Sequence, residues 1–341
     1  MDLPIVSVVI VNWNGRKYLE DCLSSLKEQT FRFFEVILVD NGSLDGSVDF
    51  VQKYYSDMVF LIKLSENMGF AKGNNIGIEK AKGKYIALLN NDTEVDKNWL
   101  KNLVSSMETD ENIGMVGSKI LNFYYRDQID NTGHLIYQDG INRGRGRLEI
   151  DCKQFDDKID ILFPSGCASL YRKKMLDEIG GFDEMFFAYG DDTDIGLHGR
   201  YLGYKAIYCP NAIVFHKYSG TTGSYSPIKA FYVERNRLWI LIKYFPIEYI
   251  LISPYFTIKR LLFQLYGMAT KQGAASKFAS DNSFFSVMKI FFSSYLSSFK
   301  GISNIIKKRK IILRKRKISI GEFKMLLKEH RISCKEISLK D

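Results

Sequence analysis

The sequence has no long uncharged stretch and no basic leader, and each absence argues against a class of protein. After about residue 228, its longest runs without a charged residue, such as 249–258 and 290–299, reach ten residues, whereas a membrane-spanning helix needs about 20. We therefore expect no transmembrane helix. The start, Met1-Asp2-Leu3-Pro4, has no basic region ahead of an apolar stretch, so we also expect no secretory signal.

Paired cysteines are missing as well. The five cysteines are odd in number and scattered, and no two of them have metal-ligand spacing. They are Cys22, Cys152, Cys167, Cys209 and Cys334. This pattern predicts free thiols in a reducing compartment. We find no internal repeat and no low-complexity linker.

The charge is unevenly distributed along the chain. The net charge is +9, but residues 231–341 hold 22 Lys and Arg against 7 Asp and Glu, a net +15, so the first 230 residues sum to −6. A mildly acidic body thus carries a strongly basic tail, which suits an anionic surface such as nucleic acid or lipid headgroups. The Phe, Ile, Leu and Tyr content of the tail favours lipid.

The first 112 residues alternate apolar runs with amphipathic segments. The runs predict strands at 5–11, 34–39, 59–64 and 85–89, and the segments predict helices at 15–28, 43–55, 70–82 and from about 97. Candidate caps are Ser43 or Asp45 for the second helix and Asp96 for the fourth. This alternation is typical of a parallel, doubly wound sheet.

The pattern changes after residue 113. We expect strands at 115–121, 162–171, 205–208 and 212–215, the last two separated by Pro210, and helices at 173–179 and 192–202. The Gly- and Arg-rich stretch 133–147 predicts a hairpin or a mobile loop. From about residue 228 the chain is helical and apolar with interspersed charges.

Four polar clusters follow apolar runs and are the strongest functional signal. They occupy residues 12–15, 40–43, 90–93 and 190–194. In an open α/β sheet, the loops that leave the carboxyl ends of the strands build the ligand crevice. Acidic and amide groups placed there can hold a nucleotide, a metal ion and a catalytic base.

Each cluster, taken alone, has two interpretations. Asp40 can accept hydrogen bonds from a nucleobase or ribose, or it can form a turn. Gly69 and Gly73 let a helix start approach a diphosphate, or they only begin a helix. Asp92 can bind Mg²⁺ or Mn²⁺, or it can belong to a polar turn. His216 can complete a metal site or touch a phosphate, or it can be structural.

The acidic run Asp191, Asp192 and Asp194 also has two interpretations. Like charges this close repel unless a cation or another partner compensates. Asp192 near a helix start can stay ionised and accept a proton, or the run can simply favour the helix dipole.

Together and in this order, the motifs resemble the family 2 inverting glycosyltransferases, in particular rhamnosyltransferases and related polysaccharide enzymes. The resemblance covers about residues 5–245. It lies in residues 8–15, 39–43, 67–71, 88–95, 180–183, 190–194, 216 and 232–236. The resemblance implies an α/β, nucleotide-sugar-binding fold of the GT-A, Rossmann-like type. In that fold a mixed sheet is flanked by helices, and here a C-terminal helical extension follows.

The resemblance also implies roles for individual residues. Asp192 matches the general base, with Asp191 in place of the family's Glu, which leaves open which carboxylate acts. Asp92 and His216 match the metal ligands for Mg²⁺ or Mn²⁺, and Asn90 replaces the first acid of the family's Asp-x-Asp motif. The implied nucleotide-sugar contacts are Val11, Asn12, Asn14, Asp40, Asn41, Asn67, Gly69, Phe70, Ala71, Asn74, Asn90 and Asn91.

We expect a catalytic domain over 1–228, with a nucleotide-binding half at 1–112 and an acceptor half at 113–228. A basic helical extension follows at 229–341. Met288, Phe292, Tyr295, Phe299, Ile302 and Ile306 share a helical stripe with serines opposite, beside basic clusters at 307–310 and 314–317. This predicts a helix on an anionic membrane through residues 285–317, or else a packed helical subdomain with a solvated basic end.

The predicted function is transfer of one sugar from a UDP- or dTDP-sugar to a glycan or lipid-linked sugar in cell-surface glycoconjugate synthesis. The Gln-x-x-Arg-Trp sequence of processive synthases is absent, and the expected place is the cytoplasmic face of the membrane. A non-catalytic nucleotide-sugar-binding or scaffold protein is an alternative. Nucleotidyl transfer usually needs a Gly-rich basic loop that residues 11–15 lack. A nucleic-acid partner is not expected, because the aromatic residues are not interleaved with Lys and Arg. The oligomeric state is not predicted.

Overall fold

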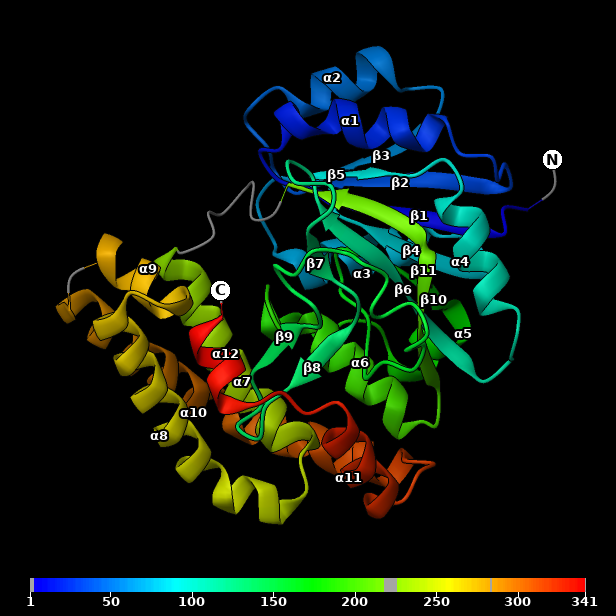
Figure 1. Cartoon of the computed structure of the whole chain (residues 1–341). Coiled ribbons are helices and arrows are strands. Elements are labelled where there is room, and N and C mark those ends of the chain that lie inside the picture. The colour runs from blue at the N-terminus through cyan, green and yellow to red at the C-terminus, as the bar shows by residue number, and fades with distance from the viewer. Residues whose placement is uncertain (1–2, 218–225, 283, 341) are drawn as a thin grey trace. The chain divides into compact units, whose positions relative to one another are not determined.

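The computed structural model describes residues 3–217, 226–282 and 284–340 (Figure 1). The chain divides into two compact units. The first comprises residues 1–133, 144–199 and 204–221, and the second comprises 134–143, 200–203 and 222–341. None of the helices in the described ranges is both long and apolar enough to cross a membrane.

The N-terminal half of the first unit is the predicted parallel sheet. Four strands lie in the order β3-β2-β1-β4, and all their pairings are parallel. The strands are β1 (Val6–Asn12), β2 (Phe34–Asp40), β3 (Val59–Lys63) and β4 (Tyr85–Leu89). The helices between them are α1 (Arg16–Lys27), α2 (Ser47–Tyr54) and α3 (Phe70–Lys80). The carboxyl ends of the four strands therefore meet at one edge, as the sequence predicts.

The sheet continues with strands of both directions, so it is mixed. The central β10 (Ala168–Arg172) runs antiparallel to β4 and to β6 (Ile113–Asn122). β11 (Lys205–His216) is parallel to β6 and antiparallel to the short β5 (Thr93–Val95). The remaining elements are β7 (Ile129–Asn131), α4 (Trp99–Met107), α5 (Lys173–Ile179), the 3₁₀ turn η1 (Glu184–Phe186) and α6 (Asp191–Tyr201).

Helices cover both faces of this sheet because its strands are apolar on both sides. One buried cluster joins Val8 and Leu38 to α1 and α4, and a second joins Val9 and Ile37 to α3 and α5. Trp99 fills the first cluster, and its indole N–H donates to Ser118 Oγ at 2.8 Å. The arrangement is the two-sided α/β sheet that the sequence predicts.

Several predicted boundaries are wrong. The strand expected at 162–171 begins only at Ala168. The two strands expected around Pro210 form one strand, because a bulge between Cys209 and Ile213 absorbs the proline without breaking the pairing with β6. Asp96 does not cap α4, whose N-cap is Asn98; instead Asp96 Oδ1 accepts the N–H of Asn98 at 2.9 Å.

The cap expected for α2 also differs. Its N-cap is Gly46, which has a φ of +82°, and no side chain caps the helix. Asp45 lies one residue earlier and accepts from the N–H and the hydroxyl of Ser47. Ser43 instead turns toward the strand ends.

The second unit is mainly helical. It contains α7 (Pro227–Tyr244), α8 (Ile247–Thr270), α9 (Gly273–Asp281), α10 (Phe284–Lys315), α11 (Ile320–Glu329) and α12 (Cys334–Leu339). β8 (His134–Ile136) pairs with β9 (Asn142–Gly144), so the stretch 133–147 forms a hairpin.

A buried ion network holds the helices of the second unit to the hairpin turn. Arg260 pairs with Asp139 at 2.7 Å and with Glu234 at 2.8 Å, and Arg237 pairs with Glu234 at 3.0 Å. Burial alone would raise the pKa of Glu234, but Arg260 and Arg237 lower it to about 2. These four side chains are buried and paired, so removing any one would leave an uncompensated charge in a dry interior.

Candidate active site

A buried chain of amide and carboxylate hydrogen bonds joins the carboxyl ends of the parallel strands. Asn12 and Asp40 are register partners at the ends of β1 and β2, and Asn12 Nδ2 donates to Asp40 Oδ2 at 2.9 Å. Asn91, two residues after β4, donates from Nδ2 to Asn12 Oδ1 at 2.7 Å. The structure therefore brings together residues from three of the four polar clusters.

Asp40 is 1% exposed and receives hydrogen bonds from the chain on both carboxylate oxygens. Besides Asn12, the N–H of Ser43 donates to Oδ1 at 2.9 Å. Ser43 Oγ in turn accepts from the N–H of Asn14 at 2.9 Å, and Asn14 Oδ1 accepts from the N–H of Leu44. Asp40 thus holds the loop that follows β2. Its contact with a base or ribose stays a prediction, and the carboxylate would accept that hydrogen bond with its remaining lone pairs.

Asn41 and Asn67 organise the turn that leads into α3. Asn41 Nδ2 donates to Asn67 Oδ1 at 3.0 Å and to the Gly69 carbonyl at 3.1 Å. Asn41 Oδ1 accepts from the N–H of Met68 at 2.9 Å. These bonds place the start of α3 beside the end of β2.

Small residues let α3 lie close against β1. A Cβ added to Gly73 would lie 2.8 Å from Val11 Cγ1. Asn74 turns back into its own helix, where Nδ2 donates to the Phe70 carbonyl at 2.9 Å. Val11 and Asn74 therefore contact other parts of the protein here. Their contact with a nucleotide sugar stays a prediction.

The start of α3 is already engaged by the chain itself. The Phe187 carbonyl accepts from the N–H groups of Phe70 at 2.6 Å and of Ala71 at 3.3 Å. The sequence interpretation left these amides available to a diphosphate, so a diphosphate at this helix start would have to displace Phe187. Phe187 and Tyr189 both have a φ of +65°, which only a well-supported loop maintains. This loop leads directly into the acidic residues of α6.

Asp191 and Asp192 occupy the first turn of α6 in different environments. Asp192 Oδ2 accepts from the N–H of Gly166 at 3.3 Å and Oδ1 from the N–H of Thr193 at 2.7 Å, bonds that stabilise an ionised carboxylate. Burial raises the pKa of Asp191 well above its usual range, and Asp192 raises it further. The geometry thus favours a neutral Asp191 beside an ionised Asp192.

His216 lies between two carboxylates. Its Nε2 is 3.3 Å from Asp92 Oδ1, and its Nδ1 is 2.7 Å from Asp130 Oδ2. Burial by itself would lower the pKa of His216, but Cys167, Asp92 and Asp130 raise it well above 6.5. The pairing of β11 with β5 sets this arrangement, since His216 is the register partner of Thr93, next to Asp92.

Asp92 and His216 fit a divalent cation. Their facing ligand atoms are 3.3 Å apart, close to the spacing of about 3 Å between neighbouring ligands of an octahedral ion. A carboxylate suits Mg²⁺ and Mn²⁺, and the added imidazole is better matched to Mn²⁺. Asp130 holds Nδ1, which leaves Nε2 directed at Asp92. The predicted ligand pair is therefore sterically and chemically suited to the ion.

One short segment connects the acid of α6 to this pair. The N–H of Gly166 donates to Asp192, and the carbonyl of the next residue, Cys167, accepts from the N–H of Asn90 at 2.8 Å. Burial raises the pKa of the Cys167 thiol, and the charge of the nearby His216 imidazole lowers it. Residues 166–167 thus bond both to the Asp192 carboxylate and to Asn90, two residues before Asp92, which supports a common site.

Sequence reasoning missed Asp130, Gly166 and Cys167. Asp130 lies 86 residues before His216, and Arg147 pairs with its other oxygen at 2.7 Å. Nothing local marks it as a partner of the histidine, because only the strand pairing of β7 with β6 brings it there.

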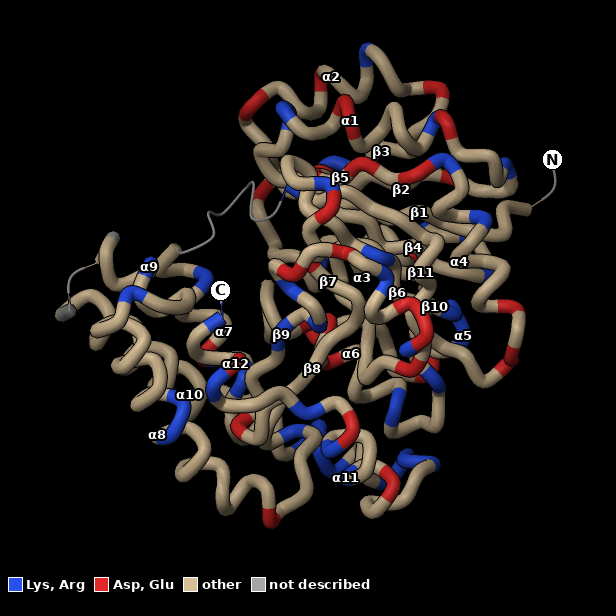
Figure 2. The backbone as a smooth tube through the Cα atoms, in the orientation of Figure 1, with Lys and Arg blue, Asp and Glu red and all other residues tan. Residues whose placement is uncertain are grey.

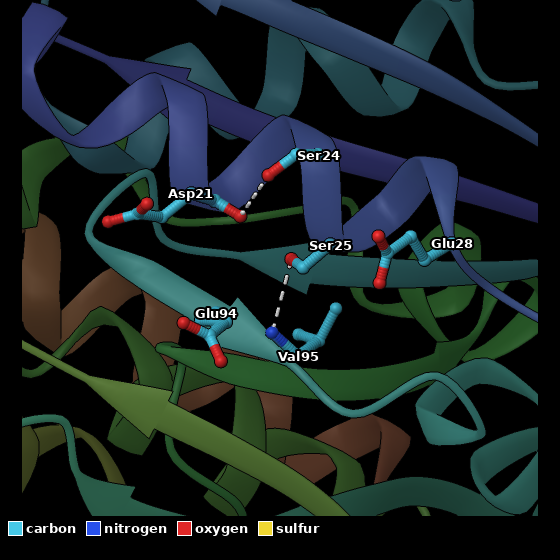
Figure 3. A pocket seen from close by; sticks show the side chains of 6 residues that line it. All are labelled: Asp21, Ser24, Ser25, Glu28, Glu94 and Val95. Atoms are coloured by element: carbon cyan, nitrogen blue, oxygen red, sulfur yellow. Dashed lines mark hydrogen bonds between the residues drawn. The ribbon is translucent and has the colours of Figure 1, made fainter.

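A pocket lies between α1 and β5. Figure 3 shows its lining, in which Ser25 Oγ accepts the N–H of Val95 at 3.2 Å. The lining residues are Asp21, Ser24, Ser25, Glu28, Glu94 and Val95. Three carboxylates around one pocket repel a diphosphate, so we do not assign the donor to it.

Comparison with known proteins finds glycosyltransferases. A family model described as "Glycosyl transferase family 2" matches residues 7–180. "Glycosyltransferase GlyG" of Streptococcus pneumoniae is 27% identical over 214 residues, which are 58% of this chain and 65% of GlyG. The matched part spans less than two thirds of the length of each of the first four curated relatives.

Two solved structures have the same fold. TarS residues 1–349 of S. aureus, in complex with UDP-GlcNAc, aligns with a TM-score of 0.55 and 16% identity over 95% of this chain and 90% of that one. The mannosyltransferase PcManGT of Pyrobaculum calidifontis, in complex with GDP-Man and Mn²⁺, aligns with a TM-score of 0.52 and 16% identity over 92% and 86%. At this identity the likeness concerns the fold.

We predict that Gly69→Ala destabilises the protein by about 2–4 kcal/mol. Gly69 has φ +86° and ψ 170°, and an added Cβ would lie 2.6 Å from the Phe187 carbonyl. Gly180→Ala is the control, because Gly180 has a φ of +90° and no atom within 4 Å of an added Cβ; we expect it to lose about 1–2 kcal/mol. Chemical denaturation compares the two, and equal losses would contradict the contact with Phe187.

We predict that Asp130→Asn weakens Mn²⁺ binding by about 10–100-fold, because the amide holds Nδ1 of His216 less firmly than a carboxylate does. Titration calorimetry with MnCl₂ measures the affinity. Asp127→Asn is the control, since Asp127 is exposed on the same segment. Equal affinities of the two variants would show that Asp130 does not support the metal ligand.

Proposed function

The chain belongs to glycosyl transferase family 2, and we propose that it transfers a single sugar from a nucleoside diphosphate sugar to a hydroxyl group with inversion at C1. The observation that carries the proposal is that residues 166–167 bond both to Asp192 and to Asn90, two residues before Asp92. A proton acceptor and a cation-binding pair near one segment are the two groups that such a transfer requires.

For the donor we favour a UDP- or dTDP-sugar. Uracil and thymine present an imide N–H beside two carbonyl groups, which a carboxylate and amides can recognise together. The network of Asn12, Asp40 and Asn91 offers that combination at the strand ends. The TarS structure with UDP-GlcNAc is consistent with this choice, whereas PcManGT carries GDP-Man on a similar fold.

In the proposed mechanism, Asp192 takes the proton of the acceptor hydroxyl as its oxygen attacks C1. The bond from C1 to the diphosphate breaks at the same time, and its electron pair leaves with the nucleoside diphosphate. Asp191, neutral and buried, keeps a second negative charge away from Asp192. A divalent cation bound by Asp92 and His216 would stabilise the charge of the leaving diphosphate.

For the acceptor we propose a glycan or lipid-linked sugar used in cell-surface glycoconjugate synthesis, reached at the cytoplasmic face of the cell membrane. This proposal is supported by the second unit, because residues 231–341 have many more Lys and Arg than Asp and Glu. Residues 285–317 would bind the anionic membrane surface. The five cysteines are free, which is consistent with a reducing compartment.

We predict that Asp192→Asn lowers transfer by about 10²–10⁴-fold while nucleotide binding persists, because the amide cannot accept the proton. Asp191→Asn should lose much less, since an amide resembles a neutral carboxylic acid. Sugar transfer is measured with the donor that gives the fastest nucleotide release in a panel of UDP-, dTDP- and GDP-sugars with Mn²⁺. The reverse ranking would assign the base to Asp191, and release from no donor would favour a non-catalytic binding protein.

We also predict that chelation with EDTA suppresses transfer by about 100-fold or more and that Mn²⁺ restores it. Asp92→Asn should reproduce the loss, and added Mn²⁺ should restore little of its activity. Undiminished transfer after dialysis against the chelator would remove the cation from the proposal.

A further inference from the structure

Helix α8 exposes most of its large apolar side chains, although Phe256 and Phe263 pack inward beside Tyr137. Its buried positions are Ser253, Arg260 and Gly267, and Arg260 lies within the ion network with Asp139. The outward residues are exposed aliphatic and aromatic side chains. They are Leu251, Tyr255, Ile258, Leu262 and Leu265, each more than half exposed.

These outward residues form one row along the helix. Their spacing of three or four residues keeps them on one face, and the row from Leu251 to Leu265 extends about 20 Å at 1.5 Å per residue. Tyr255 and Tyr266 are aromatic side chains of the kind enriched at membrane–water interfaces. In Figure 2 the tube of α8 is tan over most of its length.

Helix α10 also carries small residues on the side that faces the rest of the unit. Ser294 and Ser298 are buried on the side that faces α7, where the indole N–H of Trp239 donates to the Ser298 carbonyl at 3.1 Å. Gly301 lies directly under that indole, because an added Cβ would be 2.6 Å from it. The small residues thus let α7 approach closely.

The opposite face of α10 carries the large apolar residues and then basic ones. Met288, Phe292, Leu296 and Phe299 are exposed. At helical spacing the same row continues through Lys307, Lys310 and Arg314, which are also exposed. The exposed row therefore changes from apolar to cationic along one face.

A helix that packs on a core in water directs its apolar face inward. Here the inward faces do include apolar residues, Phe256 and Phe263 on α8 and Ile305 and Ile312 on α10. Rows of leucine, isoleucine and phenylalanine nevertheless stay exposed on the outward faces. Apolar rows this long on the surface mark a site of interaction. The cationic end of the α10 row selects an anionic, apolar partner, and a bilayer with acidic headgroups has both properties.

We infer that the exposed rows of α8 and α10 both dock the second unit on a membrane. The row on α8 enters the apolar boundary of the bilayer, and the row on α10 does the same while Lys307, Lys310 and Arg314 bind headgroup phosphates. The inference deepens the proposed membrane association of residues 285–317 and rests on it. It adds α8, which has no basic cluster and whose contribution is apolar.

Vesicle flotation with the full-length protein tests the inference. The α8 variant Leu251→Gln, Ile258→Gln, Leu262→Gln should bind about tenfold or more weakly to vesicles of equal parts phosphatidylcholine and phosphatidylglycerol. Lys307→Gln, Lys310→Gln, Arg314→Gln should lose about 100-fold on these vesicles, and phosphatidylcholine vesicles should not distinguish this variant from the parent protein. The control Phe33→Gln, Phe60→Gln, Ile150→Gln removes three exposed apolar residues from the first unit and should bind as the parent does.

The outcomes distinguish a failure of the inference about α8 from a failure of the proposed membrane association of residues 285–317. If the basic variant loses binding and the α8 variant does not, α8 has no part in docking and the inference is overturned, while the proposed membrane association stands. If neither variant loses binding, both fail. If the α8 variant converts a dimer to a monomer in sedimentation without losing vesicle binding, the row on α8 is a contact between copies and the inference is overturned. Donor hydrolysis without vesicles, measured in parallel, reports on the glycosyltransferase function separately.

Discussion

The arrangement of the candidate site depends on the buried imidazole of His216, which lies between the carboxylates of Asp92 and Asp130. The contact draws together three strands that are distant in sequence, β5, β7 and β11. A buried imidazole tolerates this position because the two acids stabilise its charged form against the effect of burial. The same charge balance would suit a divalent cation, whose binding would release the proton of His216.

The rest of the site is organised around that contact by main-chain bonds. Asn90 and Cys167 join the end of β4 to the segment before β10, and Gly166 carries the link to Asp192. On the other side, Asn91 connects to Asn12 and Asp40. The Asp192 carboxylate, the proposed cation-binding pair and the amide network are therefore held by main-chain and side-chain hydrogen bonds, which would preorganise them for a ligand.

Local patterns in the sequence predict much of this structure. The runs before Asn12, Asp40 and Asn90 are apolar on both faces and end in turn-forming residues, so the parallel strands and their shared edge could be foreseen. Non-local features could not. The bulge that lets β11 pass Pro210, the partnership of Asp130 with His216 and the Phe187 carbonyl at the start of α3 depend on segments that only tertiary pairing brings together. Periodicity likewise predicts helices after residue 228, but for residues 285–317 it leaves open whether the apolar stripe is exposed or packed.

The central claim is that the pair Asp92 and His216 and the carboxylate of Asp192 act on the same bound donor. The most direct measurement is a crystal structure with Mn²⁺ and a non-hydrolysable donor analogue, with the metal located by its anomalous scattering. The account predicts an anomalous peak bonded to Asp92 Oδ1 and His216 Nε2, with the sugar C1 of the same analogue facing Asp192. A metal bound elsewhere, or an analogue whose C1 faces away from Asp192, would contradict it.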